Sequence, residues 1–149
     1  MPLEVKLAVA ADAADCLRLR GQTRQNAVSV ARLAELSITV ESWGADIASG
    51  ALLGHVCRDD GGLVGYAFGD TRSGEVVVLA LLADYEGKGL GRRLLELVVA
   101  QLRSLGHQRL FLGCSADPAV RSYGFYRQLG WRSTGRLDRL GDEELELRA

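Results

Sequence analysis

The stretch Glu86-Gly87-Lys88-Gly89-Leu90-Gly91-Arg92-Arg93 decides the fold of this chain because it joins two unlike segments. An apolar run precedes it at residues 75–83, and residues 89–105 follow it with leucines at helical spacing. The first N–H groups of a helix have no partner inside the helix, so they can hold an anion. Glycines let the backbone approach that anion, and the lysine and arginines add positive charge nearby. We therefore predict a pyrophosphate-binding turn between a buried strand and a helix.

Two other phosphate-binding motifs are excluded by the spacing of these residues. A P-loop requires serine or threonine directly after its lysine, but Lys88 is followed by Gly89. A dinucleotide-binding fingerprint requires GxGxxG and an acidic residue about 20 positions later. Here the glycines follow the pattern GKGLG, and the strand predicted at that distance, residues 110–114, contains no acidic residue. A tight turn that binds no ligand is the alternative interpretation of Gly87 and Gly89.

The segments on either side of this turn alternate between strand-like and helix-like patterns. Residues 75–83 contain three valines in a continuous apolar run, which is typical of a central strand covered on both faces. The helix that follows carries one apolar stripe, formed by Leu90, Leu94, Leu97, Val98, Leu102 and Leu105. Further strands are predicted over residues 5–9, 52–58, 63–68, 109–114, 131–137 and 144–147. Further helices are predicted over residues 11–26, 30–36, 42–49 and from Asp117 and Pro118 to Leu129.

This order of elements predicts one domain, residues 1–149, of the α/β class with a mixed sheet (α+β). We expect a single central mixed β-sheet of about seven strands, flanked by about four helices. The sequence Asp-Asp-Gly-Gly at residues 59–62 predicts the turn of a β-hairpin. A chain of 149 residues, of which 48% are hydrophobic, can bury a core of its own.

Composition narrows the classes of function. The net charge is −1 without a basic block, which argues against nucleic-acid binding. No apolar run approaches the ~18 residues of a membrane span, and the N-terminal segment MPLEVKLAVAADAAD is a poor signal peptide. Cys16, Cys57 and Cys114 have no CxxC spacing and, with His55 and His107, complete no metal-binding pattern. Buried, reduced thiols and a cytoplasmic location are therefore expected.

Two motifs resemble those of the GCN5-related N-acetyltransferase (GNAT) superfamily. The first family signature is Q/R-x-x-G-x-G/A, and this chain has Glu86-x-x-Gly89-x-Gly91. The second is an aromatic pair, three residues, then Gly and an aromatic, matched within Gly124-Phe125-Tyr126-Arg127-Gln128-Leu129-Gly130-Trp131. The resemblance covers residues 75–131 in motif and about 5–148 in the order of elements. It implies the GNAT fold, acetyl-CoA as co-substrate and acetyl transfer to a primary amine.

The resemblance also implies a set of site residues. The main chain of the central strand would hold the pantetheine arm and polarise the thioester, and the glycine turn would hold the pyrophosphate. The cofactor-binding residues implied are Leu79, Ala80, Leu81, Gly87, Lys88, Gly89, Leu90, Gly91 and Arg92. Glu86 departs from the family's Gln or Arg, and its carboxylate would repel a pyrophosphate. This puts a side-chain contact at that position in doubt, but not the backbone N–H groups of residues 87–92.

Acetyl transfer needs a base, because a lysine-like amine with a pKa of ~10.4 is mostly protonated near neutral pH. It also needs an acid that protonates the leaving thiolate. The family places a tyrosine acid at Tyr126, for which a core tyrosine is the alternative. Glu75 stands eleven residues before Glu86, where the first signature begins. In the histone-acetylating branch of the superfamily a catalytic glutamate stands at the same distance before that signature, so Glu75 is the candidate base. The alternatives are a solvated glutamate at the strand end, the weaker candidates Asp70 and Glu41, or water alone.

The acceptor is less well defined. In the family it lies between the first two helices and the last hairpin, here residues 18–41 and 136–143. The first segment offers Arg20, Arg24, Gln25, Asn26 and Ser29, with Trp43 nearby, and the second mixes Arg136, Asp138, Arg139, Asp142 and Glu143. Neither has one dominant sign of charge, so a small amine is expected rather than a polybasic tail. Two alternatives remain: a non-catalytic CoA-binding sensor, and a structural protein that forms a homodimer through the edge of the last hairpin.

Overall fold

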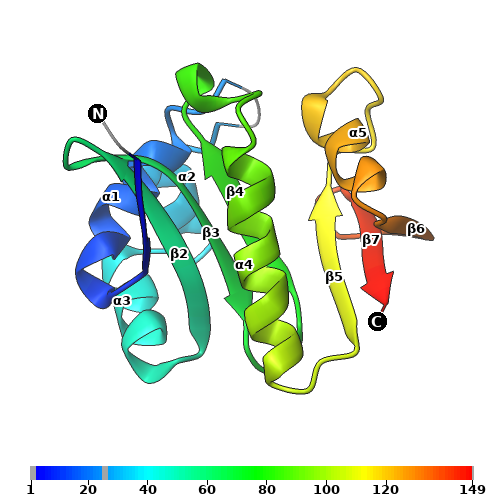
Figure 1. The fold of residues 1–149 in the computed structure, drawn as a ribbon, viewed down its shortest axis with the longest axis horizontal. Helices are drawn as coiled ribbons and strands as arrows, with labels where there is room; N and C mark the ends of the chain where they lie inside the picture. The colour runs from blue at the N-terminus through cyan, green and yellow to red at the C-terminus, as the bar shows by residue number, and fades with distance from the viewer. Residues whose placement is uncertain (1–2, 25–26, 149) are drawn as a thin grey trace.

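The computed structural model describes residues 3–24 and 27–148, whose seven strands form two sheets (Figure 1). All hydrogen-bonded neighbours within the two sheets are antiparallel. The first sheet has the order β1 (Leu3–Leu7), β2 (Leu52–Asp59), β3 (Gly62–Asp70) and β4 (Val76–Leu81). The second has the order β5 (Arg109–Cys114), β7 (Glu143–Arg148) and β6 (Arg132–Leu137). The predicted α/β (α+β) fold class is confirmed.

The junction between the two sheets differs from the single sheet that was predicted. Strands β4 and β5 run in the same direction, and in the described residues they meet only at one isolated parallel bridge, Glu75 to Phe111. The N–H of Phe111 donates to the carbonyl of Gly74 over 3.3 Å at the same place. Beyond this point β4 is paired with β3 along one edge but not with β5 along the other. One sheet is therefore split at its centre.

A β-bulge accompanies this split. Phe68 pairs with Val78 and Gly69 with Val76, so Val77 is one extra residue in β4. A bulge bends its strand and increases the local twist, which turns β4 away from β5. The apolar run of this strand had predicted that both its faces would be covered. Val77 is 37% exposed, so the strand is not covered along its whole length.

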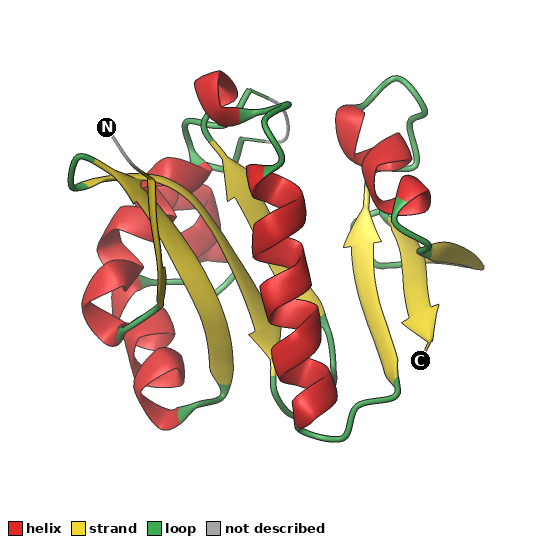
Figure 2. Ribbon diagram, in the orientation of Figure 1, coloured by secondary structure: helices red, strands yellow, loops and turns green. Residues whose placement is uncertain are grey.

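Helices cover both faces of the first sheet (Figure 2). On one face lie α1 (Ala13–Arg20), α2 (Val30–Glu35) and α3 (Val40–Ser49), around a core that includes Trp43, Tyr66 and Phe68. On the other lies α4 (Leu90–Ser104), while α5 (Arg121–Gln128) accompanies the second sheet. Two short 3-10 helices, η1 (Ala10–Asp12) and η2 (Ala83–Tyr85), complete the elements. No helix in the described ranges has the length and apolar character needed to cross a membrane.

Several predicted boundaries were wrong. The first strand ends at Leu7 rather than at residue 9, and α1 ends at Arg20 rather than at residue 26. The N–H of Val28 donates to the carbonyl of Arg20 over 2.9 Å, so the chain turns back there; Gln25 and Asn26 lie outside the described residues. Helix α5 starts at Arg121, because Asp117 accepts the Ala119 N–H in a separate turn.

Other expectations from the sequence are confirmed. Asp60 and Gly61 both have positive φ (52° and 82°), which is the geometry of the predicted hairpin turn between β2 and β3. Cys16, Cys57 and Cys114 are buried and none forms a disulfide. The edge strand β6 ends in Leu137, which is 67% exposed, and a homodimer through this edge stays a prediction.

The stripe of α4 gives a test of the packing. Leu94 is fully buried in the core, whereas Leu105, on the same predicted stripe, is 55% exposed. We expect Leu94→Ala to lower the free energy of unfolding by about 2–5 kcal/mol, because it leaves a cavity between α4 and the sheet. Leu105→Ala should change it by less than about 0.5 kcal/mol. Urea unfolding followed by circular dichroism measures both, and equal effects would contradict this packing.

Candidate active site

A cavity of about 440 Å³ lies where β4 and β5 separate. Its walls come from segments far apart in the sequence: β4, the glycine turn before α4, the end of β5, α5, the loop after α1 and the β6–β7 turn. This volume is within the range of sites for small molecules and cofactors. The separation of the two strands therefore opens a concave site between them.

Strand β4 forms one wall with both its backbone and its side chains. All six of its residues, Val76–Leu81, line the cavity, including the predicted Leu79, Ala80 and Leu81. The edge that faces β5 has no strand partner beyond Glu75, so its N–H and C=O groups are available to a ligand that lies between the strands. An extended arm with amide groups suits such an edge.

The glycine turn forms one end of the cavity. Gly87 and Gly89 have φ of 74° and 83°, a left-handed conformation that other residues adopt at a cost, and nothing lies within 4 Å of where their Cβ atoms would be. The Arg93 N–H donates to the Gly89 carbonyl over 3.1 Å, and the N–H groups of residues 90–92, which precede it in α4, have no acceptor within the helix. The turn therefore presents several donors and the positive end of the α4 dipole to an anion.

Only some of the residues predicted to bind the cofactor around this turn line the cavity. Gly87, Gly89, Gly91 and Arg92 line the cavity. The Lys88 ammonium instead lies 5.7 Å from the centre of the Tyr85 ring, and Leu90 is buried in the core. The side chains of Lys88 and Leu90 therefore do not line this cavity.

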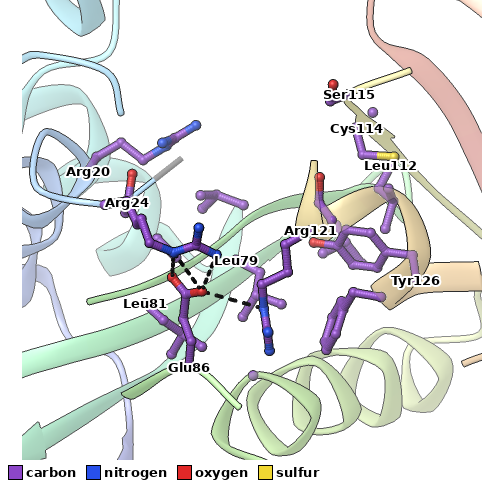
Figure 3. Close-up of a pocket in the computed structure, with 18 of the residues that line it drawn as sticks. Arg20, Arg24, Leu79, Leu81, Glu86, Leu112, Cys114, Ser115, Arg121 and Tyr126 are labelled. Carbon is purple, nitrogen blue, oxygen red and sulfur yellow. Dashed lines mark hydrogen bonds and ion pairs between the residues drawn. The ribbon is translucent and has the colours of Figure 1, made fainter. Parts of the chain in front are cut away.

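Tyr126 lies in the wall opposite β4, on α5 (Figure 3). It is 8% exposed, and its ring meets Phe125 and Trp131 edge-on with centroids 5.1 and 6.1 Å apart. Burial raises the pKa of Tyr126 well above its ordinary value, and the nearby Cys114 adds to the rise. Its phenol therefore stays protonated through the physiological range, as an acid requires.

Glu75 lies at the end of β4 where the two sheets meet. It does not line the cavity, although its neighbour Val76 does. Burial raises the pKa of the Glu75 carboxyl, and the negative charges of Asp70, Asp138 and Glu144 raise it further. The Glu75 carboxyl therefore lies beside the cavity rather than in its lining.

A second carboxylate, Asp142, was not singled out by sequence reasoning as a base. It lines the cavity from the β6–β7 turn. Burial raises its pKa, Asp138 adds to the rise, and Arg20 opposes it. In the sequence Asp142 is one of several charged residues of both signs in a hairpin. Only the fold of the turn shows that it lines the cavity. Asp70, by contrast, caps its own turn by accepting the Arg72 N–H over 2.8 Å.

Glu86 is the residue that departs from the GNAT signature, and its carboxylate is paired with arginines. Its Oε1 lies 2.9 Å from Nη2 of Arg24 and 3.6 Å from Nε of Arg121, as Figure 3 shows. All three residues line the cavity. The negative charge of Glu86 is thus offset by two cations that lie far from it in the sequence.

Comparison with known proteins agrees with this geometry. Residues 19–131 match the model of the acetyltransferase (GNAT) family, which covers more than half of the chain. The chain belongs to this family. An uncharacterised N-acetyltransferase of Mycobacterium bovis and one of Mycobacterium tuberculosis are each 38% identical to it over 88 residues. That match spans 56% of this chain and 56% of each relative.

Solved structures show the same fold at low sequence identity. PaiA N-acetyltransferase from Thermoplasma acidophilum, in complex with coenzyme A, superposes with a TM-score of 0.81 at 17% identity, covering 100% of both chains. A phosphinothricin acetyltransferase from Sinorhizobium meliloti, in complex with acetyl-CoA, gives 0.70 at 21% identity, covering 99% of this chain and 89% of that one. The whole GNAT-family chain therefore shares its architecture with these enzymes.

The glycine turn can be tested with a matched pair of variants. Gly89 and Gly61 both have φ near 80° and open space around the missing Cβ, but only Gly89 lines the cavity. We expect Gly89→Ala and Gly61→Ala each to lower the free energy of unfolding by about 1–2 kcal/mol. Only Gly89→Ala should weaken binding of coenzyme A in calorimetry. Equal binding by the two variants would show that the turn holds no part of the ligand.

Proposed function

We propose that this GNAT-family protein transfers the acetyl group of acetyl-CoA to a primary amine, on a small molecule or a peptide, by direct attack. The observation that carries the proposal is the single cavity that joins the glycine turn to Tyr126 along the open edge of β4. Anion donors stand at one end and a protonated phenol in the opposite wall, as a phosphate-bearing thioester requires. Support also comes from crystal structures of proteins with the same fold in complex with coenzyme A or acetyl-CoA.

In this proposal the chain binds acetyl-CoA mainly through its backbone. The N–H groups of residues 87–92 hold the pyrophosphate, and Arg92 adds charge from the cavity wall. The open edge at Leu79, Ala80 and Leu81 binds the pantetheine amides. An N–H of this edge also polarises the thioester carbonyl, where negative charge develops as the amine attacks.

Tyr126 then protonates the leaving thiolate. Its phenol keeps its proton because burial disfavours the charged phenolate. The attacking amine must have lost a proton beforehand, and we assign this step to Glu75 acting through water. Asp142 is a second candidate base, because it lines the cavity directly and its pKa is also raised.

Direct attack fits better than an acetylated enzyme intermediate. Among the described residues Cys114 is the one thiol that lines the cavity. Burial raises the pKa of Cys114, so little of the nucleophilic thiolate exists near neutral pH. The acceptor itself would enter between the loop after α1 and the β6–β7 turn, where Arg20, Leu140 and Asp142 line the cavity. Mixed charge around a confined space favours a small amine.

The first test is calorimetric titration with acetyl-CoA, with ATP and NAD as controls. Micromolar binding of acetyl-CoA alone is expected, followed by thiol release when an amine panel is added. Absence of binding would rule out the cofactor and favour the alternative of a structural role on this fold. Binding without thiol release for any amine would favour a non-catalytic CoA sensor.

Tyr126→Phe separates catalysis from binding. We expect it to lower kcat by about 10²–10⁴-fold while the affinity for acetyl-CoA stays unchanged, because only the proton donor is removed. Tyr123→Phe is the matched control: Tyr123 is on the same helix, outside the cavity lining, and its ring lies 3.6 Å from the Arg127 guanidinium. Full activity in Tyr126→Phe would mean that water protonates the thiolate.

The base is tested by the pH dependence of kcat/KM. A base works when deprotonated, so activity falls as pH drops through its pKa, and a raised pKa moves this fall above the ~4.3 of an ordinary glutamate. We expect Glu75→Gln to abolish this fall in kcat/KM at low pH and to lower kcat/KM about 10²-fold. If Asp142→Asn has that effect and Glu75→Gln does not, the proton passes to Asp142 instead.

A further inference from the structure

Glu86 joins three separate segments at the edge of the cavity. Arg24 belongs to the loop after α1, Glu86 to the turn before α4, and Arg121 is the first residue of α5. The Glu86 side chain is 17% exposed, whereas those of Arg24 and Arg121 are 50% and 45% exposed. The carboxylate is thus enclosed by guanidinium groups that are themselves open to solvent, with all three side chains drawn together in Figure 3.

We propose that Arg24 and Arg121 form a binding site for the phosphate groups of the cofactor, and that Glu86 is an internal anion that competes for the same two guanidinium groups. In the free protein Glu86 holds both arginines. A phosphate-bearing ligand takes them over when it enters the cavity. This inference deepens the proposed function and rests on it.

The geometry of the ion pairs leaves room for this exchange. Arg24 contacts Glu86 through Nη2 and more weakly through Nε, at 2.9 and 3.3 Å, while Arg121 lies 3.6 Å away, beyond hydrogen-bond distance. A guanidinium carries five N–H donors; Glu86 engages those on Nη2 and Nε of Arg24 and makes a longer ion pair with Arg121. Phosphate oxygens match the guanidinium fork and carry more charge than a carboxylate. A phosphate can therefore displace Glu86 from both partners.

The position of Glu86 gives its charge a direct effect on such a ligand. It directly precedes Gly87, in the turn that leads into the N-terminal N–H groups of α4. A phosphate on those N–H groups would lie beside the carboxylate. Glu86 therefore opposes phosphate binding twice, by repulsion and by occupying cations, and its removal should strengthen binding.

A purely structural ion pair predicts something different. An ion pair within one helix joins neighbours in sequence, as Arg32 and Glu35 do in α2. Arg24 and Glu86 are 62 residues apart and both face the cavity. If they only tied two loops together, removing either partner would have the same kind of effect on ligand affinity. Competition predicts opposite effects: removing Glu86 tightens binding, and removing Arg24 weakens it.

The test is calorimetric titration of wild type, Glu86→Gln and Arg24→Met with acetyl-CoA, at low and at physiological salt. We expect Glu86→Gln to bind about three- to tenfold more tightly at low salt, with a steeper loss of affinity as salt rises. Arg24→Met should bind several-fold more weakly. Glu35→Gln, which removes an arginine-paired carboxylate outside the cavity lining, should leave affinity unchanged. S-acetylpantetheine, which lacks the nucleotide phosphates, should bind equally to wild type and Glu86→Gln.

Two failures are distinguishable. If wild type binds acetyl-CoA but Glu86→Gln binds it no more tightly, or both variants change affinity in the same direction, competition by Glu86 is wrong and the proposed function stands. If no form binds acetyl-CoA, the proposed function fails, and titration with inorganic pyrophosphate then decides the arginine site alone. Tighter pyrophosphate binding by Glu86→Gln supports that site, and unchanged binding overturns it. Thermal unfolding of each variant confirms that it is folded.

Discussion

The loss of pairing between β4 and β5 is the constraint on which the rest of the structure depends. The two strands share one bridge, from Glu75 to Phe111, and then separate. An unpaired strand edge inside a protein is unfavourable unless its N–H and C=O groups find partners. The cavity of about 440 Å³ lies along this edge, and the bulge at Val77 interrupts the pairing of the same strand with β3. The fold thus keeps an incomplete sheet at its centre, and a ligand with amide groups can complete it.

The charged side chains around that gap form ion pairs, and neither sign of charge predominates. Anion donors of the glycine turn lie at one end, and beside them Glu86 is enclosed by Arg24 and Arg121. Partly buried carboxyls with raised pKa values lie where the sheets meet and at the β6–β7 turn. Buried titratable groups gathered around a cavity are more typical of a functional site than of a structural one. Both ends of the cavity therefore suit a reaction between a phosphate-bearing thioester and an amine.

Local patterns in the sequence predicted the elements but not the contacts between them. The apolar run before Gly87, the stripe of α4 and the hairpin turn at Asp60 and Gly61 each depend on neighbours in sequence, and the structure has all three. The split of the sheet, the bulge at Val77 and the turn of Asp142 into the cavity depend on pairing between distant segments. Glu86 shows the difference best, because its sequence context suggests repulsion whereas arginines 62 and 35 residues away offset its charge.

A crystal structure of the protein with acetyl-CoA would show whether the cofactor completes the open edge of β4. The account predicts the pantetheine amides hydrogen-bonded to the backbone between Val76 and Leu81, with the pyrophosphate on the N–H groups of residues 87–92. The thioester sulfur should lie near the Tyr126 hydroxyl. Acetyl-CoA bound elsewhere, or β5 closed against β4 with the edge paired, would contradict the account.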